Sequence, residues 1–586
     1  MPGKELNPKE VAAALNEVAL ILELKGENPF RVRAYANAAR SMETLENDLR
    51  TLVEGGRLKE LPGIGEGMAR QITELATVGK LDLLEELRRT IPPGHREILQ
   101  IPGLGPKKIK ALYDALQITT VGELEYACLE NRLVTLQGFG HKTQEKILKG
   151  IEQLKRYQGR YRYGEVIPAA EAILSMTLSY PKVLRASLAG SVRRKMETVG
   201  NINVVLGTSN PAEVRKGLTE MPEAEAVGLR IHSSGRLILR GGIEIDLQAT
   251  SDTLFPHRLF HLTGSLAHWN AMVVRARAVG FSLDEKGLRR GHQLIPCKEE
   301  EEIFRALGLD FIPPELRENE GEIEAAEIHQ IPRLVEGRDL RGTFHVHSSY
   351  SDGTNSIRRV AETGKKMGLS YIGLSDHSQS ARYAGGLSPA TLRKQWEEVD
   401  RANETLGGLY IFKGTESDIL ADGSLDYEEA LLREFDFVIA SVHSHFNMTS
   451  QEMTRRVVAA LRNPHTTILG HPTGRLLLAR EPYAINMESV IDEAAREGVA
   501  IELNAHPFRL DLDWRLCRYA KERGVKVAIN PDSHEEGGLA DLRFGVGIAR
   551  KGWLEAGDVL NTMDLEEMKA YLERRKSWTR HRTKKG

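Results

Sequence analysis

The chain has 586 residues and a mass of 65.3 kDa, a length that accommodates about four domains. Hydrophobic residues make up 41% and charged residues 28%, which excludes a largely disordered protein. Lys and Arg number 80 against 82 Asp and Glu, so any nucleic-acid-binding surface must be local. Three widely spaced cysteines exclude a disulfide framework and a cysteine-based zinc finger. Without an apolar run of membrane-spanning length or a signal-peptide pattern, we expect a cytoplasmic protein.

The first 160 residues are expected to be mostly helical, because apolar residues recur there at helical spacing. Three similar segments in this region each place two glycines around an apolar residue, just before a helix-like stretch. The glycines are Gly63 and Gly65, Gly103 and Gly105, and Gly138 and Gly140. Such glycines permit a tight turn that exposes backbone N–H groups at a helix N-terminus, and this geometry binds phosphate without reading bases.

Basic side chains accompany the second and third glycine segments. Lys107 and Lys108 follow the second, Lys142 follows the third, and further Lys and Arg residues continue to position 162. The segments resemble helix-hairpin-helix motifs, which implies contact with a DNA backbone. Local charge here supplies the attraction to phosphate that the net charge of the whole chain does not.

The rest of the chain changes character twice. Residues 161–310 mix short β-like runs with helical stretches, which indicates an α+β region, and residues 311–340, rich in proline and charge, are typical of a linker. Strand-like and helix-like segments then alternate. The expected strands are Thr343–His347, Tyr371–Ser375, Leu409–Lys413, Phe435–Val442, Thr466–Leu469, Val499–Leu503 and Val525–Asn530. These seven βα units predict a barrel-like parallel α/β domain.

Residue types that bind metals recur at the ends of these expected strands. His345 and His347 lie two positions apart, so regular strand alternation would put both imidazoles on one face. The other candidates are Asp352, His377, Glu416, His443, His471, Asp532 and His534. Because the carboxyl ends of barrel strands converge on one mouth, we expect a shared metal centre there. Nitrogen and oxygen ligands suit zinc, manganese or iron.

Residues 340–570 resemble the polymerase-and-histidinol-phosphatase (PHP) family through the segments HVHSSYSDG, SDH, TESDIL, SVHSH, GHPTGR and PDSH. The resemblance implies a distorted seven-stranded barrel with three divalent ions, Mn²⁺ or Zn²⁺. It implies three ligand groups: His345, His347, Glu416 and Asp532; then Glu416, as a bridge, with His443 and His471; then Asp352, His377 and His534. The first group is expected to be catalytic. Closely spaced divalent ions activate water and neutralise phosphate oxygens, so the implied reaction is phosphoester hydrolysis.

Two arginines follow the fifth and sixth expected strands. Arg475 and Arg509 are placed where a guanidinium could bind a nonbridging phosphate oxygen, and a surface salt bridge is the equally weighted alternative for each.

The order of these regions, together with the segment NPFRVRAY at 28–35, resembles bacterial and archaeal family X DNA polymerases. The resemblance implies a multidomain chain. Its parts are a helical eight-kilodalton-like DNA-binding domain (1–90), a fingers-like helix-hairpin-helix domain (91–160), an α+β nucleotidyltransferase-like palm and thumb (161–310), the linker (311–340), a C-terminal distorted (β/α)7 PHP domain (341–575) and a basic tail (576–586).

The palm departs from the family pattern. Gly190, Ser191 and Arg194 match the family's nucleotide-binding segment, but the Gly-Asp-Ile-Asp motif is replaced by amides. Asn201 and Asn203 stand at two of the three expected carboxylate positions, and Asp246 alone retains its acid. Since amides bring no charge to offset two Mg²⁺ ions, we expect Mg²⁺ binding there to be weak or absent. Polymerase activity is therefore expected to be lost or strongly reduced.

The favoured hypothesis is a DNA repair protein with a metal-dependent 3′–5′ exonuclease or 3′-end-processing phosphodiesterase, acting on gapped or nicked DNA and extending to abasic sites. We expect a monomer with no membrane association, with dNTP as a second partner of the palm. The alternatives are an active gap-filling family X polymerase, a non-catalytic DNA-binding scaffold and a small-molecule phosphatase. The helix-hairpin-helix segments argue against the last, because a small substrate does not need them.

Overall fold

The computed structural model describes residues 8–582, except for 44, 46–48, 117, 130–132, 134, 135, 137, 158, 221–228, 232–236, 240–242, 479 and 480. The last four residues of the expected basic tail, 583–586, thus lie outside the described residues. The chain forms two compact units, Met1–Gln158 and Gly159–Gly586, which are described separately. None of the helices in the described part of the chain combines the length and apolar character that a membrane span requires.

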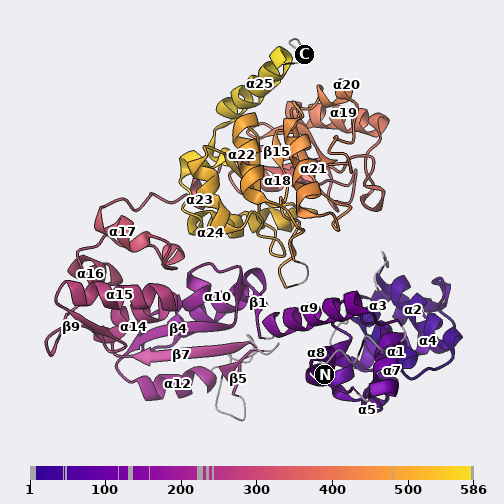
Figure 1. The fold of residues 1–586 in the computed structure, drawn as a ribbon, viewed down its shortest axis with the longest axis horizontal. Helices are drawn as coiled ribbons and strands as arrows, with labels where there is room; N and C mark the ends of the chain where they lie inside the picture. The colour runs from indigo at the N-terminus through magenta and orange to yellow at the C-terminus, as the bar shows by residue number, and fades with distance from the viewer. Residues whose placement is uncertain are drawn as a thin grey trace. The chain divides into compact units, whose positions relative to one another are not determined.

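The first unit is helical, as predicted (Figure 1). Its helices are α1 (Pro8–Leu24), α2 (Pro29–Glu43), α3 (Leu49–Glu54), α4 (Glu66–Val78), α5 (Asp82–Arg89), α6 (Pro93–Ile98), α7 (Pro106–Leu116), α8 (Val121–Leu129) and α9 (His141–Tyr157). Val11, Leu15, Val18 and Leu22 form one fully buried stripe on α1, because they recur every three to four residues. The apolar residues of the three glycine segments join this same core.

The second unit begins with the palm and thumb regions. The helices are α10 (Tyr163–Ser179), α11 (Gly190–Arg193), α12 (Pro211–Glu220), α14 (Phe255–Thr263), α15 (Leu266–Ala278), α16 (Glu300–Ala306) and α17 (Glu322–Glu327). The strands are β1 (Tyr161–Arg162), β2 (Val183–Ala189), β3 (Thr198–Val199), β4 (Asn201–Thr208), β5 (Arg230–Ile231), β6 (Leu237–Ile238), β7 (Glu244–Thr250), β8 (Ser282–Asp284), β9 (Gly287–Arg290) and β10 (Gln293–Leu294). The main sheet has the order β2-β4-β7-β6-β5, with β4 and β7 parallel neighbours at its centre.

Residues 311–340 differ from the linker that the sequence predicted. Pro314–Leu316 and Gly337–Asp339 form 3₁₀ turns, and α17 lies between them. Arg317 and Glu322 are fully buried, since Arg317 pairs with Glu300 (2.8 Å) and Glu322 with His268 (2.5 Å). Arg317 and Glu322, two of the charged residues that suggested a solvated connection, are instead members of buried ion pairs. The other domain boundaries stay predictions.

The C-terminal region is a parallel barrel. Its strands are β11 (Gly342–Val346), β12 (Tyr371–Leu374), β13 (Tyr410–Asp418), β14 (Phe437–Ser441), β15 (Ile468–Leu469), β16 (Ala500–Asn504) and β17 (Val527–Asn530). The helices are α18 (Ile357–Lys366), α19 (Pro389–Thr405), α20 (Glu429–Leu432), α21 (Ser450–Arg462), α22 (Met487–Glu497), α23 (Trp514–Glu522), α24 (Leu542–Lys551) and α25 (Leu565–Arg582), and they surround the strands (Figure 1).

The seven strands pair in chain order, which confirms the predicted distorted (β/α)7 barrel. The ring is nearly closed where Ser533, just after β17, donates its N–H to the carbonyl of His345 (3.3 Å) and accepts the N–H of His347 (2.9 Å). Phe344 and Phe437 pack inside the barrel, where a Cβ added to Gly373 would lie within 2.5 Å of each ring. Glycine in this strand therefore makes room for the aromatic layer.

Candidate metal centre

The first barrel strand presents its two histidines through an irregular backbone. The pairing of β11 with β12 shifts register between Thr343 and Val346, and His345 has a φ of 48°. The arrangement thus differs from the regular alternation expected from the sequence, because a local irregularity re-aims the side chain. His471 (φ 22°) and Asp532 (φ 51°) also lie in the left-handed region. Such conformations cost about 1–3 kcal/mol each and persist where the surroundings fix them, often at functional sites.

His345 and His347 converge on two carboxylates. His345 Nε2 lies 3.1 Å from Glu416 Oε1 and 3.3 Å from Asp532 Oδ1. His347 Nε2 lies 3.3 Å from Asp532 Oδ1 and 3.7 Å from Glu416 Oε2. The first, third and seventh strands therefore bring these four side chains together.

Glu416 is shared with a second pair of histidines from the fourth and fifth strands. Its Oε1 lies 3.2 Å from His443 Nε2 and 2.9 Å from His471 Nε2. Because Oε1 also faces His345, one carboxylate stands between two imidazole groups, as the bridging role implied by the PHP resemblance requires.

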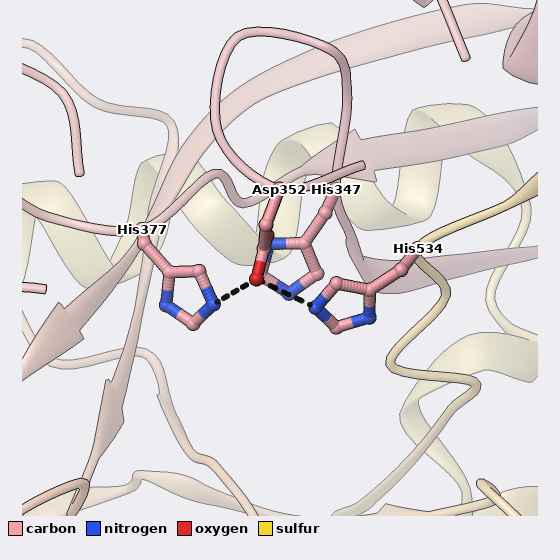
Figure 2. Close-up of side chains that lie close together, drawn as sticks. All are labelled: His347, Asp352, His377 and His534. Atoms are coloured by element: carbon pink, nitrogen blue, oxygen red, sulfur yellow. Dashed lines mark ion pairs between the residues drawn. The ribbon is translucent and has the colours of Figure 1, made fainter. Parts of the chain in front are cut away.

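Asp352 organises a third group (Figure 2). Its Oδ2 lies 3.5 Å from His377 Nε2 and 3.3 Å from His534 Nε2, and the ring of His347 stacks on that of His534 at 4.2 Å. All nine expected ligands fall into clusters whose ligand atoms lie within 4.8 Å of one another. The clusters overlap, since His345, His347, His377 and Glu416 each belong to two of them.

The nitrogen and oxygen atoms of the cluster are suited to bind cations. His345 Nε2, His347 Nε2 and Glu416 Oε2 are buried, and none makes a hydrogen bond of acceptable geometry with the described residues, although each lies close to an oppositely charged group. Buried polar atoms are normally satisfied, so orphans at such spacing indicate lone pairs that converge on a missing partner. Imidazole and carboxylate ligands fit zinc and manganese equally well.

The pKa values of the cluster also favour cation binding, because its carboxylate stays ionised. Burial would raise the pKa of Glu416, but His345, His443 and His377 together hold it well below its usual range. Burial likewise opposes the charge of His443, yet Glu416 and Asp418 raise its pKa to about 9. Removing this proton would leave an imidazole lone pair for a metal, because cations replace protons at such sites.

Carboxylates behind the cluster hold the imidazoles in place. Glu502 Oε1 lies 2.6 Å from His345 Nδ1, and its Oε2 accepts the backbone N–H of His471 (2.6 Å). Asp418 Oδ1 lies 2.5 Å from His443 Nδ1. A carboxylate on one ring nitrogen fixes the tautomer and orients the other nitrogen toward a ligand.

The sequence reasoning did not single out Glu502. The residue is fully buried in β16, a strand of sequence AIELN to which no ligand was assigned. The sequence signal that could have identified Glu502 is a single acid inside an apolar barrel strand, because a buried carboxylate needs a partner.

The two arginines behave differently. Arg475 donates through Nη2 to Glu197 (3.0 Å), through Nη1 to Asp513 (2.8 Å) and through Nε to the carbonyl of Arg509 (3.0 Å). Its expected role in binding phosphate is therefore corrected to a buried ion-pair network, since protein acceptors occupy the guanidinium. Arg509 Nε lies 3.4 Å from Asp532 Oδ2, beside the ligand cluster.

The three glycine loops of the first unit share one conformation. Gly63, Gly103 and Gly138 have φ values of 80°, 86° and 86°. In each loop the N–H of the buried apolar residue, at 64, 104 or 139, bonds to the carbonyl three residues earlier, and α4, α7 or α9 begins two residues later. A Cβ on Gly105 or Gly140 would meet none of the described atoms within 4 Å, so the helix N-termini lie open.

The lysines of these loops divide into two kinds. Lys107 and Lys142 are exposed beside the second and third loops. Lys108 instead donates from Nζ to the carbonyl of Gly103 (3.0 Å), which braces the turn. Open N–H groups and exposed lysines at one helix end are suited to a phosphate.

Comparison with known proteins agrees with both halves of this picture. Family models match a helix-hairpin-helix domain at 7–81, a SAM-like helix-hairpin-helix tandem at 96–153, a DNA polymerase beta thumb at 258–318 and a PHP domain at 343–506. The DNA polymerase/3′-5′ exonuclease PolX of Bacillus subtilis is 37% identical over 573 residues, which cover 97% of this chain and 100% of that protein. The chain belongs to the family X DNA polymerases that carry a PHP domain.

Shorter relatives match part of the chain. A probable phosphatase of Thermoanaerobacter sp. is 28% identical over 243 residues, which cover 94% of that protein but 40% of this chain. A probable phosphatase of Syntrophotalea carbinolica is 31% identical over 169 residues, 28% of this chain and 65% of that protein. The family X chain thus combines the PHP barrel with further regions that the shorter Thermoanaerobacter protein is not long enough to contain.

Among the described palm residues, two of the side chains at the positions of the family's carboxylates bond to each other. Asn203 Nδ2 donates to Asn201 Oδ1 (3.1 Å), and Asn203 pairs in register with Asp246 on the neighbouring strand. Asp246 Oδ1 accepts from Gln248 Nε2 (2.6 Å). The amides therefore satisfy each other, and a single carboxylate stands where the family pattern has three.

The expected nucleotide-binding segment is folded against the palm and thumb. Gly190 has a φ of 63°, and a Cβ there would lie 2.5 Å from Asn203 Nδ2. Ser191 accepts the N–H of Met196 at its carbonyl (3.0 Å). Arg194 donates to Glu318 (2.8 Å) and to the carbonyl of Thr263 (2.7 Å), so its guanidinium is held by protein groups.

Proposed function

We propose that this family X protein is a DNA repair enzyme whose PHP centre hydrolyses phosphodiester bonds at DNA 3′ ends. The main support is the nine-residue cluster at the barrel mouth, in which several buried nitrogen and oxygen atoms have no hydrogen-bond partner among the described residues. The Bacillus subtilis relative is named for a 3′-5′ exonuclease as well as a polymerase, which supports hydrolysis that starts at the 3′ end.

The proposed cofactors are three divalent ions, Mn²⁺ or Zn²⁺, held in the three groups centred on His345 and His347, on Glu416, and on Asp352. Bound there, such ions would supply an activated water near neutral pH and would offset the charge of the phosphate. Around them, Glu502 and Asp418 orient the imidazoles. Arg509, beside Asp532, is the proposed contact for a nonbridging phosphate oxygen.

The proposed substrate is gapped or nicked duplex DNA, with abasic sites as a further target. The three open helix N-termini of the first unit bind phosphates without reading sequence, which suits a repair enzyme that acts wherever an end occurs. The protein is proposed to act as a monomer.

The second candidate is gap-filling synthesis, which the name of the Bacillus subtilis relative and the thumb match favour. We propose that this activity is lost or strongly reduced, with dNTP and Mg²⁺ bound weakly. The support is the Asn201–Asn203 amide pair beside the single carboxylate of Asp246.

The test is the double variant His345→Ala/His347→Ala, assayed on a 3′-labelled gapped duplex with Mn²⁺. The rate of 3′ shortening should fall by about three orders of magnitude, because ion-supplied stabilisation is worth several kcal/mol. Metal content, measured by mass spectrometry, should fall in parallel, while DNA affinity should stay unchanged. Shortening that persists at the wild-type rate would refute the proposed function.

A further inference from the structure

One loop of the barrel rim connects the ligand cluster to the palm. Residues 505–510 follow β16 and carry His506, Phe508 and Arg509. Two hydrogen bonds anchor the backbone of this loop: Phe508 donates its N–H to His506 Nδ1 (3.3 Å) and accepts the N–H of Leu477 at its carbonyl (2.6 Å).

The inner end of this loop lies at the proposed reaction centre. Arg509 Nε is 3.4 Å from Asp532 Oδ2. Burial lowers the pKa of His506, and the charges of Asp532, Arg509, His534 and Arg162 all act on the same ring. The ring of His506 also lies 5.7 Å from that of Phe508, centre to centre.

The outer end of the loop presents an exposed aromatic ring. Phe508 is 39% exposed, although aromatic side chains usually bury most of their surface. The guanidinium of Arg162 lies 3.5 Å from the centre of its ring, and Arg162 also donates from Nη1 to the carbonyl of Leu477 (3.4 Å). The start of α10 presses on the same loop, since a Cβ on Gly164 would lie 2.6 Å from Pro507.

The palm therefore supplies part of the rim around the PHP centre. The Thermoanaerobacter phosphatase, covered to 94% by a match to 40% of this chain, has no room for a palm and hence for an equivalent of Arg162. The contact between Arg162 and Phe508 thus joins the barrel rim to a region that lies outside the length of that shorter relative.

We propose that Phe508, backed by Arg162, is the stacking platform for the base of the 3′-terminal nucleotide. This inference rests on the proposed function and names the substrate group that the rim recognises. The loop offers a cation, Arg509, beside the ligand cluster and an aromatic ring farther out, which matches the order of phosphate and base in a nucleotide. Stacking on an aromatic ring is tolerant of sequence, because every base has a π-face. Phe508 is a positioning residue that acts on binding and leaves the chemistry of hydrolysis to the cluster.

The experiment compares Phe508→Ala with wild type on two gapped duplexes. One ends in a normal 3′ nucleotide, and the other ends in a tetrahydrofuran residue that has a phosphate linkage but no base. With Mn²⁺, Phe508→Ala should raise KM for the normal end about tenfold and leave kcat nearly unchanged. On the base-free end, the variant and wild type should have the same KM. Met367→Ala is the matched control, because Met367 is an exposed apolar residue (43%) after α18, away from the rim.

A second variant gives a readout that does not depend on turnover. Phe508→Trp should keep wild-type KM, and its added fluorescence should be quenched when the normal 3′ end binds in EDTA but not when the base-free end binds.

An equal effect of Phe508→Ala on both substrates, no effect on either, or equal quenching by both ends would overturn the stacking role. If wild type shortens neither duplex, the proposed function fails and this inference with it. If wild type shortens both and the variant matches it, the stacking inference alone fails.

Discussion

The palm and the barrel mouth both gather polar side chains from the ends of strands, but they satisfy them in opposite ways. In the palm, Asn201 and Asn203 bond to each other and Asp246 accepts from Gln248. At the barrel mouth, buried atoms such as His345 Nε2 and Glu416 Oε2 make no hydrogen bond of acceptable geometry with the described residues. The palm side chains are thus satisfied by one another, whereas the barrel side chains keep lone pairs that are suited to a cation.

The two regions also differ in what stands behind them. The barrel cluster has Glu502 and Asp418 on the far ring nitrogens of two histidines, so its geometry is fixed before any ion binds. In the palm, Glu197 faces the barrel instead, where it pairs with Arg475 (3.0 Å). The palm region thus contributes Glu197 and Arg162 to contacts with the PHP barrel.

The supporting carboxylate provides the first way to test this difference. Glu502→Gln keeps the size of the side chain but weakens its hold on His345, so Mn²⁺ affinity and 3′ shortening should both fall about 10- to 100-fold. Titration calorimetry and the labelled-duplex assay measure the two quantities. Glu493→Gln is the matched control, because Glu493 is also buried (3% exposed) but pairs with Arg462 and Arg496 on the barrel exterior. Wild-type metal affinity in Glu502→Gln would contradict a supporting role.

The palm provides the second test, in the opposite direction. Asn201→Asp/Asn203→Asp restores the carboxylates of the family pattern beside Asp246. Primer extension with Mg²⁺ should rise about tenfold or more, since two-metal transfer gains several kcal/mol from properly held ions.

The same palm variant should respond to metal in its stability. Three neighbouring carboxylates repel each other, so its melting temperature should fall in EDTA and recover with Mg²⁺. The control is the His345→Ala/His347→Ala variant with Asn201 and Asn203 intact. Its melting temperature should not rise when Mg²⁺ is added. Primer extension by the unaltered chain at the rate of the double variant would contradict this difference between palm and barrel, because one carboxylate would then suffice.

Much of this architecture could be predicted from the sequence. All seven barrel strands were located, since short apolar runs alternate regularly with helices and each ends in a turn. The nine ligand types were found because they recur at these strand ends, and the structure places all nine in its clusters.

The errors came from residues whose role depends on distant partners. Arg475 follows its strand as a phosphate-binding arginine would, but its partner Glu197 is 278 positions away. The charged run of 311–340 resembles a solvated linker, but Arg317 pairs with Glu300 and Glu322 with His268 in the interior. The irregularity at His345 is equally invisible in a sequence, because the backbone strain depends on the closure of the barrel at Ser533.

The smallest expected effect concerns the helical unit, where the glycine loops should bind phosphate whether or not the palm is active. Lys107→Ala/Lys142→Ala removes two exposed cations beside open helix N-termini, so DNA affinity should fall several-fold at low salt, equally for all sequences. The slope of log affinity against log salt should decrease in magnitude by about 2, since each lysine releases about one counterion. Lys25→Ala/Lys80→Ala is the control: both side chains are exposed just after the C-terminal ends of helices, where the backbone repels phosphate. If the control pair changes the slope as much as the loop pair, the attraction is a general surface charge, and the glycine loops lose their assigned role.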